Sequence, residues 1–157
     1  MNQTIQIAPV RKSVVVFAAP ERAFEVFTAR IDSWWPKSHG IGAAPIRESV
    51  LEGFVGGRWY TTFEDGTEAT VGHVLAWEPG RRLVVTWEIN EQWKSDARQQ
   101  FASEVEVRFS AEADGHTRVE LEHRNFERMG AAAGETMRKG VDGGWVGLLQ
   151  LFANAVK

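Results

Sequence analysis

The sequence contains no cysteine. This excludes disulfides, thiolate metal sites, iron–sulfur clusters and a cysteine nucleophile. No apolar run is long enough to span a bilayer, and the N-terminal residues lack the pattern of a signal peptide. Basic runs are also absent and the net charge is −3, which disfavours a nucleic-acid partner. We therefore expect a soluble, cytoplasmic protein with neither nucleic-acid binding nor membrane insertion.

Tyrosine is nearly absent as well, with 1 residue, whereas the chain holds 7 Trp and 9 Phe. Hydrophobic residues make up 43% and charged residues 25% of the 157 residues, close to the averages for globular proteins. A chain of this length can bury a core without disulfides or metals. We predict one domain over residues 1–157, and the tryptophan excess is its most informative feature.

Local patterns predict a strand, a helix, several more strands and a second helix. Residues 14–17 are β-branched and aromatic, Pro20 suits the first turn of a helix, and 32–36 indicates a short second helical turn. Turn residues such as Asp65-Gly66 separate the later strands. The predicted later strands are 46–52, 58–63, 67–77, 82–88, 104–112 and 117–126, and the predicted loops are 37–45, 90–102 and 128–134.

Residues 135–157 carry one apolar stripe at helical spacing. The stripe consists of Met137, Val141, Trp145, Leu148, Phe152 and Val156. Gly140, Gly143, Gly144 and Gly147 flank it, and each glycine costs a helix roughly 1 kcal/mol relative to alanine. Either the helix starts later, or a group approaches its backbone closely. Consecutive strands with short turns form an antiparallel sheet, and this helix is its natural cover.

These segments resemble the SRPBCC (START/Bet v 1-like) superfamily, in particular its heat-shock-protein-90 ATPase activator homologue (AHSA-type) branch. The resemblance covers about residues 14–156. The matching segments are 17–24, 28–36, 56–59, 65–66, 72–75, 81–87 and 144–149. The resemblance implies an α+β helix-grip fold, in which a curved antiparallel sheet of six to seven strands wraps around a long C-terminal helix. Two short helices follow the first strand, and a cavity lies between sheet and helix.

Strand alternation predicts which side chains face that cavity. His123 shares a face with Val119 and Leu121, and Trp87 shares one with Leu83 and Val85. An inward histidine can be an acid or base, a ligand anchor or a satisfied core residue. The inward tryptophans are compatible with a pocket lining and with ordinary core, although buried indole N–H groups need partners. The facing of His73 stays open.

The candidate ligand-binding residues come from the strands, the helix and two loops. His39 follows Trp34-Trp35 in a loop at one end of the sheet. Trp93 lies on a polar segment, where it either folds back as a lid or contacts a partner. The full set is Trp35, His39, Trp59, Phe63, Trp87, Trp93, His123, Trp145, Leu148, Leu149 and Phe152.

The sequence shows no nucleophile motif, phosphate-binding loop or metal-ligand spacing, so we assign no catalytic residue, metal or cofactor. Our leading hypothesis is binding of a small hydrophobic or aromatic molecule. One alternative is a cyclase- or hydrolase-type enzyme with His123 as acid/base. The other, which the resemblance implies, is a chaperone-regulating protein with a chaperone as partner. A homodimer also stays open.

Overall fold

A computed structural model describes residues 6–157. Short 3₁₀ helices are labelled η. In chain order the elements are β1 (Val10–Val16), α1 (Pro20–Phe27), η1 (Ile31–Ser33), β2 (Ile46–Leu51), β3 (Arg58–Phe63), β4 (Glu68–Glu78), β5 (Arg82–Trp87), η2 (Gln99–Phe101), β6 (Ser103–Ala111), η3 (Ala113–Gly115), β7 (Thr117–Arg124), η4 (Phe126–Met129) and α2 (Ala131–Val156).

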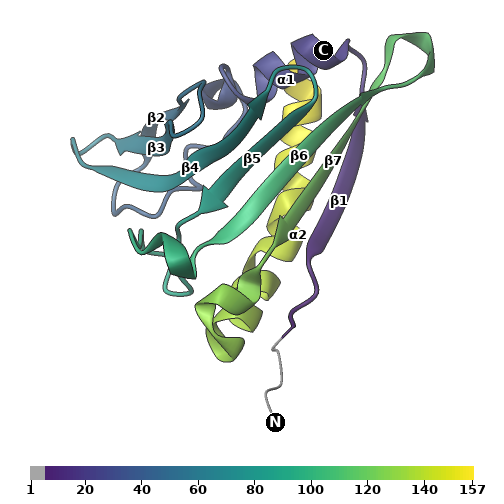
Figure 1. The fold of residues 1–157 in the computed structure, drawn as a ribbon. Helices are drawn as coiled ribbons and strands as arrows, with labels where there is room; N and C mark the ends of the chain where they lie inside the picture. Colours follow the sequence, from purple (N-terminus) through teal and green to yellow (C-terminus); the bar gives the residue numbers. More distant parts are fainter. Residues whose placement is uncertain (1–5) are drawn as a thin grey trace.

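The strands form one 7-stranded sheet in the order β1-β7-β6-β5-β4-β3-β2. Each pairing is antiparallel, and β2 to β7 follow one another as a meander. Between β1 and β2 the chain passes through α1 and η1 from one edge of the sheet to the other. Figure 1 shows the sheet curving, with α2 running across one of its faces. This arrangement confirms the predicted α+β helix-grip fold.

Strand alternation determines what the sheet presents to α2. Along β7 the side chains alternate strictly between buried and partly exposed, and Val119, Leu121 and His123 lie on the buried face as predicted. The β1–β7 ladder starts at Val10, opposite His123, so β1 is longer than its β-branched segment indicates. On β4 the ring of His73 lies on the outer side of the sheet, where it contacts the carboxylate of Glu88.

The apolar stripe of α2 is buried from Met137 to Val156, which confirms the predicted facing. The predicted loop over 128–134 is wrong, because η4 occupies Phe126–Met129 and α2 already begins at Ala131. Three consecutive alanines, which are strong helix formers, start α2 directly after Gly130, whose φ of 94° separates the two helices. The glycines of the stripe therefore do not delay the helix.

The short helical turn predicted over 32–36 forms one residue earlier, as η1. In the part of the chain that the structure describes, no helix combines the length and apolar character needed to cross a membrane.

Candidate functional site

An apolar cavity of about 220 Å³ lies between α2 and strands β3, β4 and β5. Thr61, Val71 and Trp87 form its sheet wall, one from each strand in turn. Ile89 and the loop over 39–41 close its sides. An apolar cavity of about 150 Å³ is already sufficient to take up benzene. The cavity therefore has room for an aromatic ligand.

The helix wall of the cavity contains two glycines one turn apart, Gly140 and Gly144, beside Val141, Trp145 and Leu148. A Cβ added at Gly144 would meet no other atom within 4 Å, so this glycine contributes open volume. A Cβ added at Gly140 would lie 2.8 Å from Cζ2 of Trp93. At Gly140 a group approaches the helix backbone closely, and at Gly144 the missing side chain leaves room in the cavity, which explains two of the four glycines in this helix. Nothing in the structure explains Gly143 and Gly147.

Trp93 lies across the cavity and packs on Gly140, so it folds back onto the protein. Its φ of 59° is in the left-handed region, which is rare for a side chain of this size. The turn that holds it is tied by Asn90, whose Oδ1 accepts the backbone N–H groups of Gln92 and Lys94 at 3.0 and 3.1 Å. Trp93 is still 44% exposed, so its side chain lines the cavity and also meets solvent.

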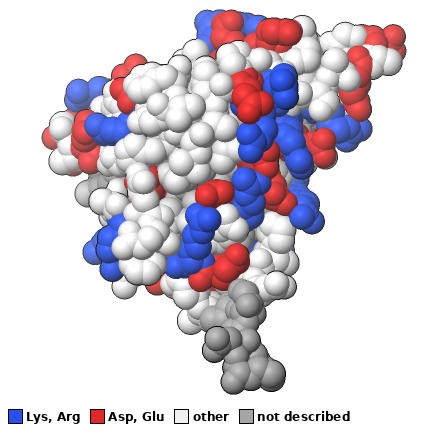
Figure 2. Space-filling model, viewed as in Figure 1, with Lys and Arg blue, Asp and Glu red and all other residues white. Residues whose placement is uncertain are grey.

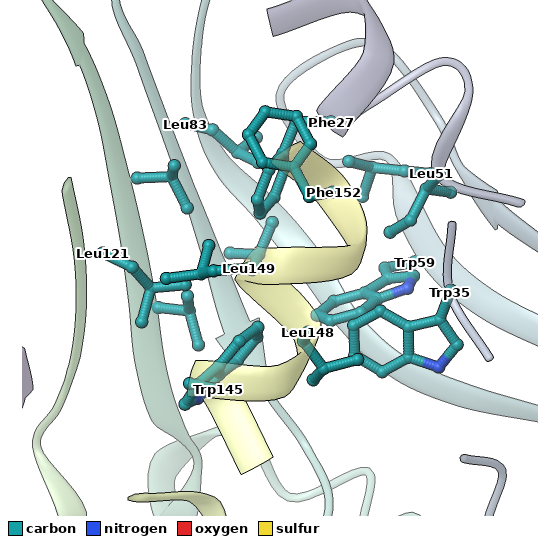
Figure 3. Close-up of a cluster of buried hydrophobic side chains, with 14 of the residues drawn as sticks. Phe27, Trp35, Leu51, Trp59, Leu83, Leu121, Trp145, Leu148, Leu149 and Phe152 are labelled. Carbon is teal, nitrogen blue, oxygen red and sulfur yellow. The ribbon is translucent and has the colours of Figure 1, made fainter. Parts of the chain in front are cut away.

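Four tryptophans pack against one another beneath the cavity. Ring centroids are 5.3 Å apart for Trp35 and Trp59, 5.8 Å for Trp59 and Trp87, and 5.9 Å for Trp87 and Trp145. Figure 3 shows Trp35 and Trp59 beside Leu148, with Trp145 lower on the same helix. Trp59 does not line the apolar cavity. It borders a void of about 10 Å³ deeper in the core. The tryptophans therefore divide the space between sheet and helix into a filled interior and an open end.

The indole N–H groups add little polarity to the cavity. Trp35 donates to the backbone oxygen of His39 at 3.3 Å, and Trp145 donates to Nδ1 of His123 at 3.1 Å. The N–H groups of Trp59 and Trp87 are shielded, and no acceptor lies near them among residues 6–157. Thr61 is the polar side chain of the sheet wall.

His123 is completely buried and lies outside the cavity lining. Because an indole N–H only donates, Nδ1 of His123 accepts from Trp145, and Nε2 carries the hydrogen and donates to Oγ of Ser103 at 2.8 Å. The ring stacks on Phe126 at 4.5 Å. Burial lowers the pKa of His123 to about 3. The imidazole is therefore neutral, with both nitrogens bonded inside the protein, and it orients Trp145.

The structure brings together part of the predicted set. Trp35, His39, Trp87, Trp93, Trp145 and Leu148 line the cavity. Phe63 packs behind it, where Cβ atoms added at Gly40 and Gly42 would lie 2.8 and 2.9 Å from its ring. Leu149 and Phe152 lie in the filled interior, as Figure 3 shows.

Sequence reasoning missed Thr61, Val71, Ile89 and Ile41 as lining residues. Thr61 lies between Trp59 and Phe63 in the alternation of β3, so its inward facing was readable. Ile89 lies two residues beyond the end of β5 and continues the alternation of Leu83, Val85 and Trp87, so its inward facing could also have been predicted.

Charged side chains are concentrated on the other face of the sheet. Arg124 bonds with Glu104, Glu106 and Glu122, and Glu106 also bonds with Arg82. Figure 2 shows these charges as a band over β6, β7 and β1. Within residues 6–157 no three His, Asp or Glu side chains are grouped so as to hold a metal ion. The described residues thus form an apolar cavity on one side of the sheet and a charged band on the other.

Three comparisons bear on this cavity. The family model "Activator of Hsp90 ATPase homolog 1-like protein" matches residues 18–157. The comparison with curated proteins finds no match.

Among the solved structures that are similar over nearly the whole chain, two share more than 30% of their residues with it. "An anthrahydroquino-Gama-pyrone synthase Txn09 complexed with SUM" is 44% identical, covers 97% of this chain and 98% of its own, and has a TM-score of 0.68. The self-sacrificing resistance protein CalC from Micromonospora echinospora is 33% identical, covers 94% and 93%, and has a TM-score of 0.71.

Proposed function

The chain belongs to the family of Activator of Hsp90 ATPase homolog 1-like proteins, and from this premise we propose that it binds a small, flat aromatic molecule beneath Trp93. The family and the similar structures support ligand binding or a cyclase-type role in general terms. The observation that carries the finer proposal is the cavity of about 220 Å³ between α2 and the sheet. Its walls combine flat indole rings with two glycines that leave the helix side open.

The shape and chemistry of the walls specify the ligand further. Trp35, Trp87 and Trp145 offer faces and edges to an aromatic ring, which gains from such contacts beyond the area it buries. Thr61 offers one hydroxyl that can donate to or accept from the ligand. We therefore expect an apolar ring system with an oxygen substituent near β3. The 44% identical relative, whose name is "anthrahydroquino-Gama-pyrone synthase", supports an oxygenated aromatic ligand.

Filling the cavity tests the proposal. In Gly144→Leu the new side chain enters the cavity without a clash at Cβ, whereas Gly143→Leu adds the same side chain outside the cavity lining. Binding of 2-naphthol should quench tryptophan fluorescence in the wild type and in Gly143→Leu. Gly144→Leu should lower the affinity at least tenfold. Equal affinities in the two variants, or no binding to the wild type, would overturn the proposal.

The role of Thr61 can be tested with two ligands, 2-naphthol and naphthalene, which differ only in a hydroxyl group. Thr61→Val removes the hydroxyl and keeps the shape of the side chain. A hydrogen bond contributes about 0.5–1.5 kcal/mol, so the affinity for 2-naphthol should fall about two- to tenfold. The affinity for naphthalene should not change. A parallel loss for both compounds would show that Thr61 acts through packing alone.

A cyclase-type reaction is the second candidate, favoured by the name of the 44% identical relative. His123 does not suit the part of acid/base, because its two nitrogens are bonded to Trp145 and Ser103. The polar groups at the cavity are Thr61 and the loop residue His39. If the protein is a cyclase-type enzyme, the cavity would hold a flexible substrate in the conformation from which its ring closes. Product formation that disappears in His39→Ala and persists in His123→Gln would support it.

A further inference from the structure

A second cavity, of about 280 Å³, opens where β5 ends. It shares Trp87 and Ile89 with the apolar cavity, and its other walls combine polar side chains with the apolar residues Phe101, Ala102 and Met129. Glu88, Asn90, Glu91, Asp96 and Arg98 line it. None of these residues belongs to the candidate site described above, so the cavity raises a separate question about its occupant.

Glu88 is the unusual residue of this cavity, because its side chain is only 2% exposed. One carboxylate oxygen, Oε2, accepts from Oγ1 of Thr86, from Nδ1 of His73 at 2.7 Å and from Nε2 of Gln99 at 3.4 Å. These three donors hold the carboxylate in one orientation. Burying a carboxylate is costly unless its oxygens are paired.

The other oxygen of Glu88, Oε1, accepts no hydrogen bond from residues 6–157. Since Oε2 is turned toward Thr86 and His73, Oε1 is the oxygen that remains for an occupant of the cavity. The fold therefore presents a fixed, buried hydrogen-bond acceptor at the wall of a polar cavity.

The remaining charges determine what such an acceptor can bind. Arg98 is already paired with Asp96 through two contacts of 2.7 and 2.9 Å, and its guanidinium lies over the ring of Phe101. This pairing holds the pKa of Asp96 at about 2. With Asp96 and Arg98 balanced, Glu88 and Glu91 leave the lining negative. Anionic groups are therefore disfavoured, and positively charged donors are favoured.

We propose that the second cavity binds an organic ammonium group, with Glu88 as the acceptor and the ring of Trp87 as an aromatic wall. A carboxylate and an aromatic ring are the two partners that an ammonium group uses, through a charge-assisted hydrogen bond and a cation–π contact. The proposal goes beyond the function of the apolar cavity and does not depend on it. A ligand that carries both a ring and an amine would occupy the two cavities on either side of Trp87.

Three small probes of the same shape test the charge preference in the wild-type protein. Benzylamine is a cation at neutral pH, benzyl alcohol is neutral and benzoate is an anion. In calorimetric titrations benzylamine should bind at least tenfold more tightly than benzyl alcohol, and benzoate should not bind. Equal affinities for benzylamine and benzyl alcohol in Gly144→Leu, where the apolar cavity is filled, would overturn the proposal.

Variants then locate the binding. Glu88→Gln should abolish the preference for benzylamine, whereas Glu112→Gln, which removes a carboxylate outside the cavity lining, should retain it. A preference unchanged in Glu88→Gln contradicts the proposal. Gly144→Leu, which fills the apolar cavity, should leave benzylamine binding intact. Loss of benzylamine binding in Gly144→Leu would place the amine in the apolar cavity and overturn the proposal. Failure of 2-naphthol to bind would instead count against the proposed function alone.

Discussion

The two halves of α2 pack differently against the same sheet. Toward the C-terminus, Phe152 contacts Phe27 and Trp34 with ring centroids 5.1 and 5.5 Å apart, and this half is filled. Toward the N-terminus, Gly140 and Gly144 face the sheet across an open cavity. The open half is nevertheless the one that four of the tryptophans line, namely Trp35, Trp87, Trp93 and Trp145. Large residues therefore do not guarantee a filled core.

The difference follows from the shapes of the residues. Phenylalanine and leucine side chains of the filled half are buried together in one hydrophobic cluster. In the other half, rigid indole rings meet edge to face and support one another around the space. Glycine on the facing helix removes the side chains that would otherwise fill the gap. A cavity results because neither wall can collapse onto the other.

The largest expected effect lies in the filled half. Phe152 is fully buried, and Phe152→Ala leaves a void that its rigid neighbours cannot fill. The free energy of unfolding should fall by about 3–5 kcal/mol, measured by urea denaturation. Leu151→Ala is the control, because this residue is largely exposed on the same helix and should change stability by less than about 0.5 kcal/mol. Similar losses of stability in Phe152→Ala and Leu151→Ala would show that Phe152 is not tightly packed in the C-terminal half of α2.

The free energy of unfolding should depend on pH through His123, which is bonded to Trp145 in the open half. Its pKa is about 3 in the folded protein and 6.5 when exposed, so between these values the unfolded chain binds a proton that the folded protein does not. Above pH 6.5 this histidine is neutral in both states and does not lower the stability. As the pH falls from 6.5 toward 3, the free energy of unfolding decreases by up to about 1.4 kcal/mol per pH unit.

The comparison of wild type with His123→Gln isolates this contribution, because the other titrating groups are common to both proteins. A glutamine amide can also donate to Ser103 and accept from Trp145. Urea unfolding at several pH values between 3 and 7 should give a smaller pH dependence in the variant. If the two proteins lose stability in parallel, His123 does not control the acid sensitivity.

The smallest effects distinguish the two glycines of the open half. Gly144→Ala has free space at Cβ and should gain up to about 1 kcal/mol from helix propensity. Gly140→Ala places its Cβ against Trp93, so the clash should offset this gain and displace the indole. Thermal unfolding and the fluorescence of Trp93 check both expectations. An equal gain in the two variants would mean that Trp93 is not held on the helix.

The alternation of polar and apolar residues predicted much of this molecule. It identified the strands from 46 onward, the buried stripe of α2 and the inward facing of His123, because these depend on neighbours in the chain. It could not separate Trp59 from Trp87, which share an inward facing although only Trp87 lines the apolar cavity. It also could not show that His123 meets Ser103, because that contact depends on how β6 and β7 are paired.

The sequence by itself determined the order of strands and helices and the excess of tryptophan, since periodicity and composition are properties of the chain, and the resemblance to a known family added the expectation of a helix-grip fold. Tertiary structure decided which tryptophans border the apolar cavity, that Trp93 closes over Gly140, and that Glu88 is buried beside His73. These contacts join residues from different strands, loops and helices. They form only when the sheet curves and α2 docks, so no local pattern encodes them.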